Sequence, residues 1–139
     1  MNDGFRMRPA TIGDLDGVRR LLLACGLPAE GVAEHLGDGY VVAEHDAGLV
    51  GVAGVERHAA HGLLRSVAVD PAWRDRSVGR ALTDDRLSWA AAAGLDAVYL
   101  LTIDADAYFE RFGFRRVPRD AAPFGISGSS EFRSLCPVT

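Results

Sequence analysis

The stretch from residue 62 to residue 93 constrains the possible fold of this chain more than any other part of the sequence. A run rich in valine and leucine, typical of a strand, ends at Val69. Pro71 prevents this strand from continuing in the middle of a sheet, because proline cannot donate to the hydrogen-bond ladder. A loop of arginines and small residues follows, and a helical pattern begins at about Val78. The stretch therefore predicts a strand that leads through a loop into a helix.

Hydrophobic periodicity and turn residues predict the other elements. Strands are expected at 4–9, 39–44, 49–58, 62–69 and 97–103, with further strands beginning at 114–117 and spanning 131–136. Helices are expected from the cap at Thr11 to Cys25-Gly26, and at 29–36, 78–93 and 104–112. This order predicts a mixed α/β or α+β fold in a single domain that spans residues 1–139.

Composition limits the classes of protein to which the chain can belong. The net charge is −4, which argues against nucleic acid as a partner, and no apolar run reaches the roughly 18 residues of a membrane helix. The first residues lack a secretory signal pattern, so a cytoplasmic location is expected. Cys25 and Cys136 form neither a disulfide framework nor a zinc pattern. His58 and His61 are expected in a turn, where a solvated loop is far more common than a metal site, so we expect no metal there.

The loop before residue 78 carries the features of an anion-binding site. Arg74 and Arg76 supply guanidinium groups, and the small residues Ser77 and Gly79 allow a ligand to approach the backbone. The helix that follows begins with free amides and a partial positive charge. Because the chain contains no lysine, phosphate contacts are expected from arginine or from backbone amides. The features together predict a pyrophosphate cradle, and the alternative is a surface connection with solvated arginines.

Two segments resemble motifs of the GNAT superfamily of N-acetyltransferases. In the first, residues 64–79, Arg74 and Gly79 match the family's Arg/Gln-x-x-Gly-x-Gly/Ala pattern, while Ser77 stands where the family usually has its first glycine. The second, residues 105–114, is similar to the family's A-x-x-F-Y-E-K-x-G-F block. The resemblance implies a mixed, mostly antiparallel sheet that is splayed at an acetyl-CoA site and flanked by about four helices.

The resemblance also implies which residues bind acetyl-CoA, and it implies no metal. The implied acetyl-CoA-binding residues are Val67, Ala68, Val69, Arg74, Asp75, Arg76, Ser77, Val78, Gly79, Arg80, Ala81, Thr102 and Phe109. Amides of the splayed strand, at Val67 and Val69, would stabilise the developing oxyanion. The family's leaving-group tyrosine falls at Phe109, and Tyr108 lies one position earlier, which turns a helical side chain by about 100°. Either Tyr108 reaches the site through a local distortion, or the thiolate leaves with help from solvent.

Glu56 and Arg65 are expected on adjacent strands of a hairpin. With the turn centred between His58 and Leu63, Glu56 lies opposite Arg65, and Arg65 shares a face with Val67. One interpretation is a cross-strand ion pair worth about 0.2–1 kcal/mol. In the other, Arg65 binds an acceptor carboxylate, and Glu56 accepts the amine's proton directly or through water. The two interpretations are compatible, and the sequence leaves both open.

Two functional hypotheses follow. The first is an N-acetyltransferase that transfers acetyl from acetyl-CoA to a small amine by direct attack in a ternary complex. Residues 64–69 and 131–137 resemble the small arsenic-resistance-associated N-acetyltransferases, which implies an amino-acid-like acceptor. The second is a non-catalytic acyl-CoA-binding or sensor module on the same fold, motivated by Ser77 and Phe109. A homodimer formed through the C-terminal strands is also consistent with the sequence.

Overall fold

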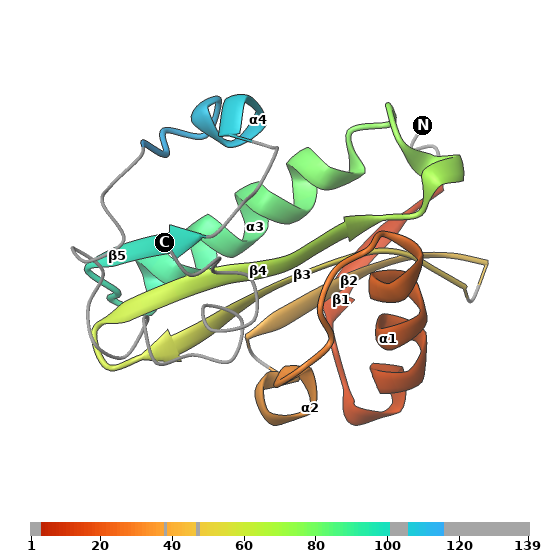
Figure 1. Cartoon of the computed structure of the whole chain (residues 1–139), viewed down its shortest axis with the longest axis horizontal. Helices are drawn as coiled ribbons and strands as arrows, with labels where there is room; N and C mark the ends of the chain where they lie inside the picture. Colours follow the sequence, from red (N-terminus) through yellow and green to blue (C-terminus); the bar gives the residue numbers. More distant parts are fainter. Residues whose placement is uncertain (1–3, 38, 47, 101–105, 116–139) are drawn as a thin grey trace.

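The computed structural model describes residues 4–37, 39–46, 48–100 and 106–115. It contains a five-stranded sheet with the strand order β1-β2-β3-β4-β5 (Figure 1). The strands are β1 (Arg6–Pro9), β2 (Tyr40–His45), β3 (Gly48–His58), β4 (His61–Val69) and β5 (Ala97–Leu100). Neighbouring strands are antiparallel except for β4 and β5, which are parallel. The prediction of a mixed, mostly antiparallel sheet is confirmed.

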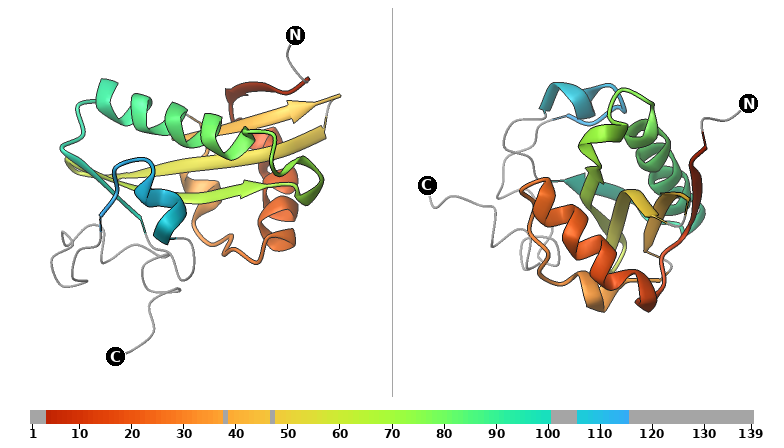
Figure 2. Two further views of the ribbon diagram at one scale, coloured as in Figure 1. Left: turned by 90° about the horizontal axis from the view of Figure 1, so that it is seen from above. Right: turned by 90° about the vertical axis from the view of Figure 1, so that its right-hand side faces the viewer.

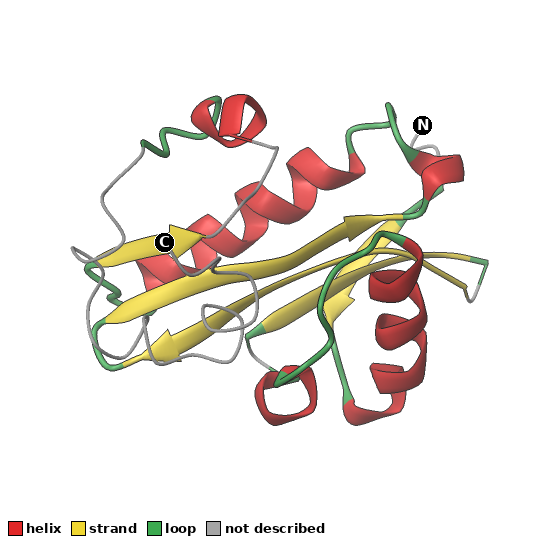
Figure 3. Ribbon diagram, viewed as in Figure 1, coloured by secondary structure: helices red, strands yellow, loops and turns green. Residues whose placement is uncertain are grey.

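Helices cover both faces of this sheet (Figures 2 and 3). They are α1 (Leu15–Ala24), α2 (Val32–His35), α3 (Val78–Ala92) and α4 (Asp106–Glu110), with 3₁₀ turns at Ile12–Asp14 and Pro71–Trp73. α1 and α2 pack on one face, and α3 packs on the other. The expected four helices are therefore present, and the long helix predicted at 78–93 agrees with α3 to within one residue.

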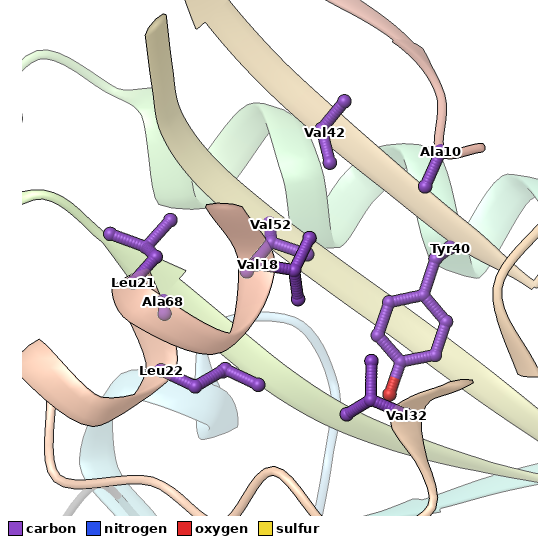
Figure 4. Close-up of a cluster of buried hydrophobic side chains, with 9 residues drawn as sticks. All are labelled: Ala10, Val18, Leu21, Leu22, Val32, Tyr40, Val42, Val52 and Ala68. Carbon is purple, nitrogen blue, oxygen red and sulfur yellow. The ribbon is translucent and has the colours of Figure 1, made fainter. Parts of the chain in front are cut away.

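Each face of the sheet has its own hydrophobic cluster. The cluster beneath α1 and α2 consists of Ala10, Val18, Leu21, Leu22, Val32, Tyr40, Val42, Val52 and Ala68 (Figure 4). The cluster beneath α3 consists of Val41, Ala43, Val50, Ala53, Val78 and Leu82. Successive side chains of a strand point to opposite faces, so Val41 and Val42 belong to different clusters. The central strands are thus apolar on both sides, as expected when helices cover both faces.

Local hydrogen bonds fix the start of α1. The Asp14 carboxylate accepts the backbone N–H of Thr11 at 2.7 Å and the Arg8 guanidinium at 2.8 Å. The hydrogen bonds from Arg8 lower the pKa of Asp14 to about 2. The predicted cap at Thr11 is confirmed, although the first turn is a 3₁₀ turn and α1 begins at Leu15.

The β3–β4 hairpin has a different register from the predicted one. His58 pairs with His61 across a two-residue turn, so Glu56 lies opposite Leu63, and Arg65 lies opposite Gly54. The prediction that Glu56 lies directly opposite Arg65 is therefore wrong by two positions. The reason is that the turn is shorter than the one expected, because His61 already belongs to β4.

β4 also contains a β-bulge. The pairs Val52–Ala68 and Gly54–Arg65 leave two residues of β4, Ser66 and Val67, opposite a single residue of β3. Val67 packs against the cluster beneath α3, whereas Arg65 donates to the carbonyl of Pro28 in the connection between α1 and α2. The prediction that Arg65 and Val67 share a face is wrong, because the extra residue interrupts the alternation of side chains along the strand.

Several predictions lie outside the described residues. They concern Cys136, Thr102, residues 101–103 of the expected fifth strand, the strand at 131–136 and the dimer through the C-terminal strands. Phe114 and Arg115 are described and are not part of a strand. The described pairing of β4 with β5 ends at Leu64 and Leu100, so the splay beyond this point stays a prediction. Among the helices of the described part, none is long and apolar enough to span a membrane.

Candidate functional site

The loop between β4 and α3 lies at the surface. Its start is held by Asp70, whose carboxylate accepts the amide of Ala72 at 2.9 Å. Residues 74–77 are exposed and lead directly into the first turn of α3. The guanidinium groups of Arg74 and Arg76 and the first amides of a 15-residue helix therefore lie in one exposed segment. This is the arrangement that the anion-cradle interpretation predicts.

Two residues of this loop have left-handed backbone angles. The φ of Asp75 is 65° and that of Ser77 is 63°, in the region that favours glycine. Ser77 occupies the N-cap position of α3, but its side chain makes no capping hydrogen bond. The sequence analysis identified Ser77 as a replacement for glycine, but it missed the same conformation at Asp75. The loop thus keeps its shape with two non-glycine residues.

An aromatic side chain contacts the guanidinium of Arg76 in this loop. Its guanidinium lies 4.8 Å from the centroid of the Trp73 ring, a cation–π contact. The Trp73 ring lies in turn 4.8 Å from the ring of His45 and 6.5 Å from that of Phe5, measured between centroids. These contacts join the loop to β2 and to the residue before β1. The sequence analysis missed them, because nothing in the spacing of these residues indicates contact.

α4 brings Tyr108 to the first turn of α3. An ideal Cβ on Gly79 would lie 3.0 Å from the Tyr108 hydroxyl oxygen and 3.5 Å from Cγ2 of Val69. The hydroxyl therefore reaches the start of α3 at Gly79, despite the one-position offset from the family motif. Burial raises the pKa of Tyr108 above its ordinary value of 10. The hydroxyl is consequently protonated at neutral pH and can act as a donor.

Phe109 belongs to an aromatic group on and after α4. Its ring lies 5.0 Å from that of Tyr108, 6.5 Å from that of Phe112 and 6.0 Å from that of Phe114. These contacts place the Phe109 ring among other aromatic side chains, and the acetyl-CoA contact implied for Phe109 stays a prediction. The remaining predicted acetyl-CoA-binding residues fall on β4 (67–69), in the loop (74–77) and in the first turn of α3 (78–81).

A pocket of about 400 Å³ opens between α3 and α4. Its lining consists of Arg80, Asp84, Leu87, Tyr108, Arg111 and Phe112. The volume lies within the range of small-molecule sites, and the lining combines two guanidinium groups with apolar and aromatic surface. Of these residues, the sequence predicted Arg80 as a cofactor-binding residue and Tyr108 as a catalytic candidate. The others come together because α4 and the residues that follow it lie beside α3.

A buried charged cluster lies on the opposite face of the sheet. Glu56 is 1% exposed and Arg65 is 2% exposed, and Arg65 Nη1 donates to Glu56 Oε2 at 2.5 Å. Arg65 also donates from Nη2 to the carbonyl of Pro28 at 3.3 Å and from Nε to the hydroxyl of Ser66 at 3.2 Å. His58 Nε2 lies 3.1 Å from Glu56 Oε1. The expected ion pair is present as a diagonal contact, and each guanidinium nitrogen of Arg65 contacts a protein group.

The two histidines of the hairpin lie on its two strands, next to the turn. His58 and His61 pair across the turn, and the ring of His61 lies 6.0 Å from that of Tyr99. Within the described ranges, no three or more histidine, cysteine, aspartate or glutamate side chains are placed to hold a metal ion.

Comparison with known proteins gives matches across most of the chain. Residues 37–116 match the family described as acetyltransferase (GNAT) domain. A curated relative, an uncharacterized N-acetyltransferase of Chlorobaculum tepidum, is 24% identical over 95 residues, which are 68% of this chain and 60% of the relative. The chain therefore spans about 60% of the length of that relative.

Two solved structures share the fold. Rv2747 from Mycobacterium tuberculosis, in complex with CoA and NLQ, has a TM-score of 0.74 and 24% identity, and the match covers 94% of this chain and 89% of that protein. N-acetylglutamate synthase from Neisseria gonorrhoeae, complexed with coenzyme A and N-acetyl-glutamate, has a TM-score of 0.80 and 23% identity, over 96% of this chain and 33% of that protein. At these identities the likeness concerns the fold alone.

Proposed function

This chain belongs to the acetyltransferase (GNAT) domain family, and from this premise we propose that it is an acetyl-CoA-dependent N-acetyltransferase. Its proposed acceptor is a small, amino-acid-like amine that attacks the thioester directly in a ternary complex. The observation that carries the proposal is the meeting of three features at the start of α3. They are the exposed arginine loop, the free amides of the helix, and the protonated hydroxyl of Tyr108.

The pyrophosphate of acetyl-CoA is assigned to the loop and to the first turn of α3. Arg74 and Arg76 supply charge-assisted hydrogen bonds, and the backbone amides supply fixed donors. The cation–π contact with Trp73 supports this role for Arg76, because it limits the conformations of a long side chain before binding. The pocket between α3 and α4 continues from this turn and adds Arg80 and Arg111 to the positive surface.

The transfer step forms a C–N bond between the amine nitrogen and the acetyl carbonyl carbon, and it breaks the thioester C–S bond. The amides of Val67 and Val69 receive the developing oxyanion. The bulge supports this role for Val67, since one residue of a bulged strand is left out of the hydrogen-bond ladder and Val67 is one of the two residues at the bulge. Tyr108 gives its proton to the leaving thiolate sulfur. The position of its hydroxyl beside Gly79 and its raised pKa support this assignment.

The proton of the attacking amine is assigned to Glu56. Its Oε1 lies 3.1 Å from His58, whose side chain is 21% exposed, so a proton received by Glu56 has a short route to solvent. Arg65 is assigned to hold Glu56 and not an acceptor carboxylate. Its side chain is 0% exposed, and its three nitrogens contact Glu56, Ser66 and Pro28.

An amino-acid-like acceptor is supported by two observations. The N-acetylglutamate synthase with a similar fold was solved with N-acetyl-glutamate, and the resemblance to small arsenic-resistance-associated N-acetyltransferases points to the same class of amine. The polar groups of Glu56, His58 and Ser66 lie on the face of the sheet opposite α3, where an acceptor would approach from α1 and α2.

Two measurements test the proposal. Titration calorimetry with acetyl-CoA should give binding in the micromolar range, and thiol release should be detected with at least one amine from a panel of glutamate-like, arsenic-containing and phosphorus-containing amino acids. The double variant R74Q/R76Q should lose binding. The control R19Q/R20Q makes the same charge change on exposed α1 positions and should bind normally. Absence of acetyl-CoA binding at high micromolar concentration would overturn the proposal.

A second function is favoured by Phe109, which stands where the family's leaving-group tyrosine falls, and by Ser77, which stands where the family usually has its first glycine. A non-catalytic acyl-CoA-binding or sensor module on the same fold needs no residue that protonates the leaving thiolate. It predicts CoA binding without thiol release for every amine in the panel, so the same experiment separates the two functions.

A further inference from the structure

Tyr40 connects three strands of the sheet. It lies on β2 directly opposite Gly54 of β3, and an ideal Cβ on Gly54 would collide with the Tyr40 ring. The ring therefore crosses over β3 at a glycine, the only residue without a Cβ that would collide with it. Its hydroxyl reaches β4, where it lies 3.0 Å from the hydroxyl of Ser66. Figure 4 shows the Tyr40 ring within the cluster beneath α1 and α2, with Val32 beside it.

Ser66 is the residue at which β4 bulges. Its φ is 61°, and it shares with Val67 the space opposite one residue of β3. A serine in this backbone region is strained, so surrounding contacts must hold it there. Two contacts do so. The hydroxyl of Ser66 accepts a hydrogen bond from Nε of Arg65 at 3.2 Å, and it shares a second hydrogen bond with Tyr40.

We propose that Tyr40 is a positioning residue for acetyl transfer. Its hydroxyl fixes Ser66 and thereby the direction of the Val67 amide, which receives the oxyanion in the proposed mechanism. The inference rests on the proposed function for its catalytic consequence, but its structural part, that Tyr40 holds the bulge, stands independently. Tyr40 is 0% exposed, so it acts through Ser66 and does not touch the reacting atoms.

The chemistry of this contact suits a positioning role. The hydrogen bond is buried, since Tyr40 and Ser66 are 0% and 5% exposed, and a buried hydrogen bond competes little with water. Oxyanion stabilisation depends on a donor that is already aimed at the developing charge. A small rotation of the bulge would weaken that donor in the transition state, while the arginine loop that binds the cofactor would keep its geometry.

The decisive variant is Tyr40→Phe, which removes the hydroxyl and keeps the ring over Gly54. We expect kcat to fall about 5- to 10-fold, the effect of one lost buried hydrogen bond, with KM for acetyl-CoA within twofold of wild type. Ser66→Ala should give a similar loss, and Tyr40→Phe should add nothing further in the Ser66→Ala background. The control Tyr99→Phe removes a hydroxyl from β5 and should leave kcat unchanged. Full kcat in Tyr40→Phe, or additive losses in the double variant, would overturn the inference.

A second measurement does not depend on activity. Amide hydrogen exchange, followed by NMR, should accelerate at least fivefold at Ser66 and Val67 in Tyr40→Phe and should be unchanged in the first turn of α3. Unchanged exchange at the bulge overturns the structural part even if the chain proves to be no acetyltransferase. Faster exchange at Ser66 and Val67 in Tyr40→Phe, together with no thiol release by the wild-type protein for any amine, would support the structural part and reject the proposed function, so the two failures are distinguishable.

Discussion

Asp75 combines two features that oppose each other in the loop before α3. Its φ of 65° gives the loop the shape that a glycine would give, while its carboxylate lies between Arg74 and Arg76 and reduces their net charge from +2 to +1. Two replacements separate these features. Asparagine keeps a side chain that tolerates the left-handed region and removes the charge, and glycine removes both the charge and the strain.

The charge effect can be estimated from Coulomb's law. A carboxylate about 7 Å from one phosphate charge in a water-like medium costs roughly 0.6 kcal/mol, so the two charges of a pyrophosphate give about 1.2 kcal/mol before screening. Screening by salt reduces this value, since the Debye length is about 10 Å at 0.1 M. D75N should therefore bind acetyl-CoA about 3- to 8-fold more tightly than wild type at low ionic strength.

The backbone effect should be smaller. Glycine relieves a left-handed strain of about 1 kcal/mol, but it also adds about 0.4–1 kcal/mol of conformational entropy to the unfolded chain. Both of these terms act on folding stability, and D75G removes the same charge as D75N. D75G should therefore resemble D75N in affinity, and S77G should change both affinity and Tm little. The unchanged net charge of S77G makes it the control for the charge argument.

Titration calorimetry at 0.05 M and 0.5 M NaCl measures both effects. The gain of D75N should be present at low salt and should shrink to less than twofold at high salt. If D75N binds no more tightly than wild type at low salt, or if its gain is the same at both salt concentrations, the pyrophosphate does not lie beside Asp75. If only D75G gains affinity, backbone strain and not charge limits the loop.

Three further outcomes follow from single side chains. Y108F should lower kcat at least about tenfold in a thiol-release assay. Because burial raises the pKa of Tyr108, the kcat of the wild-type protein should show no loss from tyrosine ionisation up to about pH 10. E56Q removes the carboxylate that pairs with buried Arg65, so urea denaturation should show a free energy of unfolding lower by about 3 kcal/mol. Arg8 lowers the pKa of Asp14 from 3.8 to about 2. The contribution of the Arg8–Asp14 interaction to folding stability is therefore complete above about pH 4 and is lost as the pH falls toward 2. D14N should be less stable at neutral pH and should lack this part of the acid transition.

The sequence predicted those parts of the fold that depend on local pattern. The helical periodicity after residue 78 and the proline at 71 placed α3 and its loop, because both signals act within a few residues. The family motif then linked the loop to the block at 105–114, and the structure does bring Tyr108 of that block beside Gly79. Only the family resemblance predicted a contact between the loop before α3 and the block at 105–114.

The sequence did not predict the features that depend on strand register. The hairpin turn contains two residues, whereas a turn centred between His58 and Leu63 would contain four, and this difference moves Glu56 two positions from the place opposite Arg65. No turn signal in the alanine pair at 59–60 distinguishes the two lengths. The sequence also gives no sign of the bulge at Ser66, because a residue with a left-handed backbone is usually recognised as a glycine, and this residue is a serine. The same reason explains why the conformation of Asp75 was missed.

The bulge at Ser66 is what allows β4 to serve both faces of the proposed site. In a regular strand, Arg65 and Val67 would point to the same face, and the guanidinium would lie in the apolar cluster beneath α3, where an unpaired charge costs several kcal/mol. The extra residue turns Arg65 toward Glu56 on the side of α1 and α2, while Val67 keeps its place beneath α3. In the proposed mechanism, proton transfer and cofactor binding therefore occur on opposite sides of one strand. This arrangement requires a strained backbone at Ser66, and hydrogen bonds between the Ser66 hydroxyl and the side chains of Tyr40 and Arg65 hold that residue in place.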